Sequence, residues 1–517
     1  MSGQPAPAGA LPGPTPSGAG GPAAGPAPLA GPAARLPRPP GPFDLAVREF
    51  WAAGRLPART GVLAWAAVAG FAGGALVGHR LGLGAAVVGV LLWAPALPAL
   101  VRRKVWGDLG TVAVSIALLA MAAVLDAGWV VSLCVVVSAI AAAAASTSAR
   151  SAPAVVLSGI GAGAGGVRAV AWLVKAAADR LGARRGGVLT GLRSVAVTVV
   201  LLVVFGALFS SADRIFASYV PRLNLDLLPG QVVVGLLVGL VTATFAHLAL
   251  EPPDWSDLRL PRARAARRAE WLLPVVALDA MVLSFVLVQV GALVGGHDYV
   301  QRTAGVTYAE YAREGFAQLV AATALTLVVV GLAARRAPRT SDVDRLISRA
   351  ALGVLCVATL GVVASALRRM DLYVEAFGLT RLRLLVVVGE ITLGALVVLV
   401  LVAGIRWRAG WLPRAVVQVV AVAMLGLAVL NPDALIVRHN ATAELQSGLD
   451  VGYLDGLSAD AVPAVDELPE PLRTCLLRRI EVPPPDGLVS WNLGRQRAQQ
   501  VRADGAGLLL DATCPGS

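Results

Sequence analysis

Residues 382–404 read LRLLVVVGEITLGALVVLVLVAG, an apolar run whose only charged residues are Arg383 and Glu390. About 20 such residues are enough for a helix to cross the ~30 Å hydrocarbon core of a bilayer. Lipid offers the backbone no hydrogen-bond partners, so a run of this kind is expected to be helical. It is one of about eleven in the chain, which predicts an all-α polytopic membrane protein. The predicted spans are 61–78, 81–101, 109–126, 128–147, 194–210, 229–250, 271–294, 315–334, 347–367, 382–404 and 411–430.

The composition agrees with this class. Hydrophobic residues make up 57% of the 517 residues and charged residues only 15%, which is outside the range of soluble domains. The formal net charge is +12, and nearly all of the positive charge is arginine. A basic balance can indicate nucleic-acid binding, but these arginines are spread among short connections between spans. We therefore expect the lipid bilayer as a partner and no nucleic acid.

The distribution of Lys and Arg predicts the orientation of the chain. With the N-terminus in the cytoplasm, 28 of the 44 basic residues fall on the inner side, 9 in outer connections and 7 in the C-terminal region. The chain is therefore predicted to be a multi-pass protein of a bacterial cytoplasmic (cell) membrane, with its C-terminus extracytoplasmic. A twelfth span in the glycine-rich segment 152–167 would instead place the C-terminus in the cytoplasm. The amphipathic segment 167–181 that follows is typical of a helix at the inner interface, or of one that contacts protein.

Three regions differ in composition. Residues 1–60 form a Pro/Ala/Gly-rich tail that we expect to be disordered and cytoplasmic, because it has too few large apolar side chains to bury. Residues 61–430 hold the spans, and 431–517 form a polar C-terminal region with helix starts near Ser458 and Pro469. We expect a small, soluble, helical region outside the membrane. There a disulfide between Cys475 and Cys514 is permitted, although the sequence does not show the pairing.

Searches for catalytic motifs give no candidate. The sequence contains no P-loop, no HExxH, no G-x-S-x-G and no Cys/His cluster, so no catalytic residue, cofactor or metal ion is predicted. The pattern Gly161-x-Gly163-x-x-Gly166 follows no strand and is not interpreted as a dinucleotide site. Gly74-x-x-x-Gly78 and Gly235-x-x-x-Gly239 are typical of helices that approach each other closely.

Three polar residues lie within or at the end of predicted spans. Asp279 and Glu390 are carboxylates in otherwise apolar helices, and His247 lies near a span end. An isolated acid in lipid is costly, so each carboxylate should face protein or water. Asp279 and Glu390 would serve a proton or cation relay or contact a substrate. Alternatively, they are protonated or paired groups that hold two helices together. For His247 we expect an interfacial position.

Polar chemistry also gathers in the predicted outer connections, where arginine is normally rare. Six arginines lie in the last two of these connections. Either they pair with neighbouring acids and hold the C-terminal region, or they form a site for an anion or a lipid headgroup. The candidate residues on this face are Asp213, Arg214, Asp298, Tyr308, Glu310, Tyr311, Arg313, Arg368, Arg369, Asp371, Tyr373, Arg381 and Arg383.

The same connections carry motifs that occur in a known family. They are SADRIF at 211–216, YAEYAREGF at 308–316 and FGLTRLR at 377–383, followed by Asn431-Pro-Asp433, Asn440 and LDxxYLxxLSxDAVP at 449–463. In this order they resemble a bacterial membrane family, common in actinobacteria and catalogued as a domain of unknown function of the 4153/4173 type. The resemblance covers roughly 190–470. It implies a multi-span membrane protein and no established activity.

Three classes of function remain. The sequence favours a non-enzymatic envelope or signalling component, with a ligand or partner site on the outer face, because the polar residues gather there. The first alternative is a transporter or flippase that uses Asp279 and Glu390, although no internal repeat supports it. The second is a lipid-linked transferase or hydrolase at the outer surface, with Asp213, Asp298 or Glu310 as acid or base. Envelope proteins and lipid or anionic ligands are the corresponding partners.

Overall fold

The described part of the chain is helical. A computed structural model describes residues 60–183, isolated helical positions within 194–209, and 227–255, 267–304, 316–338, 341–407, 409–445, 448–484 and 487–504. The side chains of several residues within 177–183 and of 292–304 are not described. These residues contain α- and 3₁₀-helices and no strand, and they belong to one compact unit, Ala53–Ser517. The prediction of an all-α chain is confirmed.

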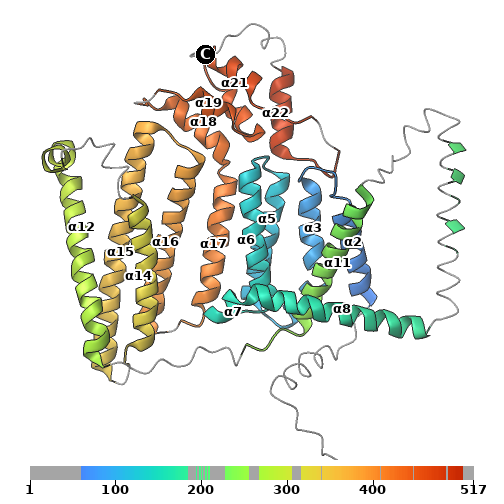
Figure 1. Ribbon diagram of the computed structural model, residues 1–517, viewed down its shortest axis with the longest axis horizontal. Coiled ribbons are helices and arrows are strands. Elements are labelled where there is room, and N and C mark those ends of the chain that lie inside the picture. Colours follow the sequence, from blue (N-terminus) through green and yellow to red (C-terminus); the bar gives the residue numbers. More distant parts are fainter. Residues whose placement is uncertain are drawn as a thin grey trace, which may run out of the picture. The chain divides into compact units, whose positions relative to one another are not determined.

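Within the described residues, eight helices are long and apolar enough to cross a membrane, as expected of a membrane protein (Figure 1). Their apolar side chains remain partly exposed, because they have lipid as well as protein to face. They are α5 (Trp106–Ala120, continued by the 3₁₀ turn η1, Met121–Ala123), α6 (Gly128–Ser146), α11 (Leu228–Leu250), α12 (Arg268–Ala304), α14 (Phe316–Arg336), α15 (Asp342–Phe377), α16 (Arg381–Arg406) and α17 (Leu412–Val429).

The first two predicted spans differ from this pattern. The first is a helix of only 15 residues, α2 (Thr60–Gly74). The second is divided into α3 (Leu83–Trp93) and α4 (Leu97–Arg102), because Pro95 has no N–H to continue the helix. The fifth predicted span, 194–210, lies largely outside the described residues. A total of eleven spans therefore stays a prediction.

Segment 152–167 does not form one of the eight candidate spans. The short helix α7 (Ala152–Val156) is followed by α8 (Ser158–Ala183), which continues through the predicted amphipathic segment. Figure 1 shows α8 lying crosswise to the longer helices. Trp172 is buried against protein, whereas Val174 is 63% exposed. An orientation of this kind is typical of a helix at a membrane interface.

Helices α2 and α11 cross unusually closely. A Cβ placed on Gly70 would lie 2.8 Å from the carbonyl oxygen of Gly235, and a Cβ on Gly235 would lie 2.9 Å from that of Gly70. Gly74 and Gly239 make similar approaches one turn away. The close helix approach expected of Gly235-x-x-x-Gly239 is therefore observed. In the first motif only Gly74 takes part, because α2 ends there and Gly78 lies in a turn with φ of +84°.

The C-terminal helices pack on the ends of the candidate spans and share their core (Figure 1). Leu427 of α17 and Leu476 of the C-terminal region belong to one buried cluster, and each is 0–1% exposed. The helices concerned are α18 (Pro432–Thr442), α19 (Val451–Asp455), η3 (Ala459–Ala461), α20 (Val462–Val465), α21 (Leu472–Arg479) and α22 (Leu493–Asp504). We call them together the tail.

Candidate functional site

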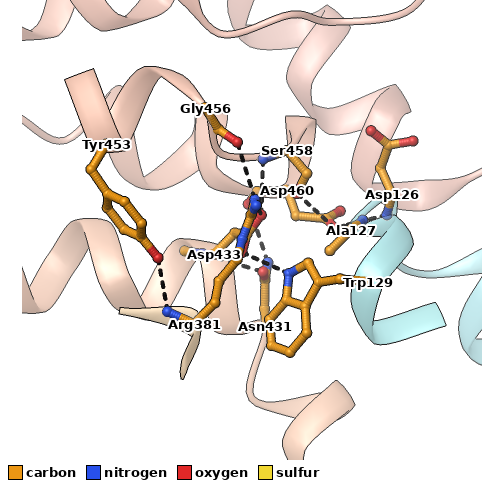
Figure 2. A network of polar contacts seen from close by, with 11 residues as sticks. Asp126, Ala127, Trp129, Arg381, Asn431, Asp433, Tyr453, Gly456, Ser458 and Asp460 are labelled. Atoms are coloured by element: carbon orange, nitrogen blue, oxygen red, sulfur yellow. Dashed lines mark hydrogen bonds and ion pairs between the residues drawn. The ribbon is translucent and has the colours of Figure 1, made fainter. Parts of the chain in front are cut away.

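The tail meets the span ends at a charged network centred on Asp433 (Figure 2). Asp433, in the first turn of α18, is fully buried, and the side chain of Arg381, at the start of α16, is one-third exposed. Arg381 Nε donates to Asp433 Oδ1 at 3.0 Å, and a terminal nitrogen donates to Oδ2 at 2.7 Å. This fork is the strongest common pairing between two side chains. It joins the tail to the connection between α15 and α16.

Two further donors complete the environment of Asp433. The backbone N–H of Ser458 donates at 2.9 Å, and the indole Nε1 of Trp129 donates at 3.3 Å. Burial raises the pKa of Asp433, but the hydrogen bonds from Arg381 and Ser458 outweigh burial, so that the pKa lies below its usual value. Asp433 is therefore an ionised anchor at neutral pH.

Asp460 binds the turn between α5 and α6 (Figure 2). Its Oδ2 accepts the backbone N–H groups of Asp126 and Ala127, both at 2.7 Å, immediately before α6 begins. A carboxylate at a helix start is favoured by the helix dipole. Its Oδ1 is buried and has no hydrogen-bond partner in the described part of the chain. Burial raises the pKa of Asp460 to about 6, despite the two backbone donors.

The carbonyl groups of the same turn are bound from α22 and the residue before it. The side-chain amide of Asn492 donates to the carbonyl oxygens of Ala122 and Leu125 at 2.9 and 2.8 Å. The N–H of Gly494 donates to the carbonyl oxygen of Val124 at 3.0 Å. Backbone groups at the end of an apolar hairpin need such partners wherever water is excluded. The tail thus completes the hydrogen bonding of the α5–α6 hairpin.

The raised pKa of Asp460 leads to a pH-dependent stability. The folded state holds the proton on Asp460 more tightly than the unfolded chain, so this contribution is present below about pH 4 and is lost as the pH rises through about 6. For protein in detergent we expect the tail to be more easily released at pH 7 than at pH 5, by about 1 kcal/mol, the part of this contribution that is lost between the two pH values. Limited proteolysis of the tail at the two pH values measures this. Asp460→Asn should remove the difference, and an unchanged difference in that variant would contradict the assignment.

The connection between α15 and α16 is bound by a second set of polar groups. The amide of Asn440 accepts the N–H of Leu379 at 2.6 Å and donates to its carbonyl oxygen at 3.0 Å. Gly378 has φ of +79°, and a Cβ there would lie 2.9 Å from Asn440 Oδ1. The hydroxyl of Tyr453 accepts the N–H of Arg381 at 2.8 Å. Residues of the motifs FGLTRLR, NPD and LDxxYLxxLSxDAVP therefore meet in one place.

The other candidate arginines that the structure describes on this face also have protein partners. Arg368 pairs with Asp371 at 2.6 Å, and both side chains are about half exposed. Arg369 donates to the amide oxygen of Gln289 at 3.0 Å, which connects α15 to α12.

Arg383 binds groups close to the start of its own helix, α16. It donates to the carbonyl oxygen of Phe377 at 2.8 Å, and its guanidinium lies 4.3 Å from the ring centre of Tyr373. All four arginines of the predicted connection between the ninth and tenth spans thus bind protein groups. The geometry supports pairing, rather than an open anion site, at these positions.

Several residues predicted for the site are not described by the structure, in whole or in part. Asp298 lies in α12, but its side chain is not described. Cys475 is buried in α21 and is disulfide-bonded, but because Cys514 is not described, the pairing of the two stays a prediction. Outside the described residues are Asp213, Arg214, Tyr308, Glu310, Tyr311, Arg313 and Cys514.

The three polar residues of the candidate spans are all buried. Asp279 of α12 is 7% exposed and Glu390 of α16 is 1% exposed, and both helices pack against α15. Asp279 Oδ1 and both carboxylate oxygens of Glu390 have no hydrogen-bond partner among the described residues. His247 is buried near the end of α11, with its ring centre 5.3 Å from that of Trp172. The structure places the three residues on separate helices.

Sequence reasoning missed several ion pairs at the opposite ends of the candidate spans, among them Arg268 with Asp344 at 2.6 Å and a pair between α5 and α17. Arg414 at the start of α17 pairs with Asp108 at the start of α5, and Ser148 donates to the other oxygen of Asp108 at 3.1 Å. Each charged residue lies in the first turn of an apolar helix. The sequence shows opposite charges at these two helix starts, but it does not show that the two helices pack against each other. Trp129 and Asn492 were missed for the same reason.

Comparison with known proteins gives one match. The family model described as Domain of unknown function (DUF4153) matches residues 112–468. The match begins well before the roughly 190 at which the sequence resemblance began, and it includes Arg381, Asp433 and Asp460. Neither the curated proteins nor the solved structures contain a match.

Proposed function

The chain belongs to the DUF4153 family, and on that premise we propose that it is a non-enzymatic component of a bacterial cell envelope. In this proposal the chain crosses the cytoplasmic membrane several times, with its N-terminus inside. The tail lies on the outer face, where it presents a surface to a ligand or to an envelope protein. The distribution of basic residues supports this orientation.

The charged network at the base of the tail is the observation that carries the proposal. Arg381 and Asp433 satisfy each other, and the donors around Asp433 leave it no free role as an acid or base. The strongest polar groups of this face therefore hold the tail in a fixed position. A rigid platform on membrane helices is suited to recognition, because binding then costs little ordering entropy.

A transporter or flippase is the second candidate, and one observation favours it. Asp279 and Glu390 are buried, and their carboxylates lack partners among the described residues. Buried acids within membrane-spanning helices are typical of proton or cation pathways. They are also typical of protonated groups that hold helices together, and the two residues lie on different helices.

The recognition proposal is tested by photo-crosslinking in intact cells. Crosslinkers at Glu481 and Gln500, two exposed positions of the tail, are expected to give a discrete adduct, whereas one at the exposed Arg406, at the other end of α16, should not. The combined change Asp279→Asn and Glu390→Gln should leave the tail adduct unchanged, because it does not touch the recognition surface.

The same experiment distinguishes the recognition proposal from the transporter. If the tail positions give no adduct while the combined change abolishes the cellular phenotype at an unchanged protein level, the transporter is favoured and the recognition proposal is wrong. If the adduct persists and the phenotype survives the combined change, the transporter is excluded.

A further inference from the structure

A cavity of about 290 Å³ lies where the tail meets the span ends. Its apolar wall comes from the α5–α6 turn and the end of α17, and includes Val124, Val429 and Leu430. Its polar wall includes Arg438 of α18 and Arg497 of α22. One side of the cavity thus continues the surface that faces lipid, and the other belongs to the polar tail.

The two arginines are available to a ligand. Arg438 has a 3.4 Å contact with Glu467, and both side chains are more than half exposed, so this ion pair contributes little. Arg497 is exposed and makes no hydrogen bond or ion pair within the part of the chain that the structure describes. Asn431, Ala434 and Arg438 all line the cavity from one face of α18, as their spacing requires.

Asp460 supplies the opposite charge. It lines the same cavity, is 1% exposed, and is the residue whose Oδ1 lacks a donor among the described residues. Gly494 lies beside it in the wall, where a Cβ would overlap that oxygen. A buried carboxylate oxygen without a donor is costly, so the site favours a ligand that brings one.

The neighbouring charges do not fill this need. Asp126 is paired with Arg495 at 2.7 Å, and Asp433 is paired with Arg381, so these four groups are already neutralised in pairs. The cavity is left with one carboxylate, two guanidinium groups and an apolar wall. This arrangement complements a molecule that carries a cationic donor, an anion and an apolar chain.

We propose that the cavity binds a phospholipid with a phosphoethanolamine headgroup, whose ammonium donates to Asp460 Oδ1 and whose phosphate lies against Arg497 and Arg438. The inference rests on the proposed position of the tail at the outer membrane surface and names the ligand of that face. The acyl chains extend over Val429 and Leu430, which are 69% and 58% exposed. A phosphoglycerol headgroup has only hydroxyl donors, and a phosphocholine headgroup has no N–H, so both are bound less well.

The test is competitive lipid binding to the full-length protein, delipidated in detergent and measured by native mass spectrometry. The probes are phosphatidylethanolamine, phosphatidylglycerol and phosphatidylcholine with identical chains. We expect the wild-type protein to retain phosphatidylethanolamine over the other two by about ten-fold, the value of one charge-assisted hydrogen bond. Asp460→Asn keeps the shape of the side chain and should reduce this ratio to about one.

Two arginine variants complete the design. Arg497→Gln should weaken all three phospholipids several-fold, because it removes a phosphate contact. Arg479→Gln is the matched control, since this exposed arginine of α21 does not line the cavity. Selectivity is measured on bound protein only, so a variant that partly unfolds does not imitate the result.

Three outcomes would overturn the inference. They are equal retention of the three lipids by the wild-type protein, unchanged selectivity in Asp460→Asn, and displacement of the lipid by soluble phosphoethanolamine at the same concentration. The last would show that the headgroup alone suffices and that no membrane lipid is selected. If selectivity is absent while the tail adducts persist in cells, this inference fails and the proposed function stands.

Discussion

Replacing Arg381 with methionine is expected to release the tail from the ends of the spans. Asp433 is fully buried, and Arg381 supplies two of its four donors. Removing one partner of a buried pair leaves an uncompensated charge, which typically costs 3–5 kcal/mol. Because the Arg381 side chain is one-third exposed, water can replace part of the contact, and we expect about 3 kcal/mol. The measurement is thermal unfolding together with limited proteolysis of the tail in detergent.

Arg368→Met provides the matched control. Arg368 pairs with Asp371 near the same connection, but both partners are about half exposed, so the loss should not exceed about 1 kcal/mol. Adding Asp433→Asn to Arg381→Met should recover part of the stability, because the amide carries no charge to compensate. Equal effects of the two arginine substitutions would show that the Asp433 pair does not hold the tail.

The long apolar helices could be predicted from the sequence because each one is decided by its own residues. Helix α16 (Arg381–Arg406) contains the predicted 382–404 and begins at the capping residue Thr380, whose hydroxyl accepts the N–H of Arg383. Interruptions within short apolar runs were harder to predict. Leu83–Trp93 and 152–167 are apolar in sequence, and only tertiary packing and proline positions decide where their helices end.

The candidate site could be predicted only in part, because its contacts join residues that are distant in the sequence. Asp433 and Arg381 are separated by 52 positions, and Asp460 and Ala127 by 333. The sequence singled out Arg381 as a candidate residue, whereas Asp433 and Asp460 occurred only within the motifs of the family resemblance, and nothing showed that the three meet. Asn492 lies outside the recognised motifs and depends entirely on the end of the α5–α6 hairpin that it binds.

The second large effect is expected at the crossing of α2 and α11. In Gly235→Val even the first added carbon would lie 2.9 Å from the carbonyl oxygen of Gly70, and a backbone atom cannot move aside as a flexible side chain can. The helices must therefore separate, which we expect to cost about 3 kcal/mol. Resistance to unfolding in sodium dodecyl sulfate and protein level in the membrane both measure the loss.

Gly331→Val in α14 is the control, because a Cβ there meets nothing within 4 Å. It bears the same intrinsic penalty of a β-branched residue in a helix without the steric conflict.

The difference in stability between the two variants should be large because of the length of α2. Its 15 described residues extend only about 22 Å, less than the hydrocarbon core, so this part of the helix cannot rely on spanning alone. In lipid, close packing against a neighbour replaces the hydrophobic force between helices. A helix this short therefore depends on contact with α11, and equal stability of the two variants would show that it does not.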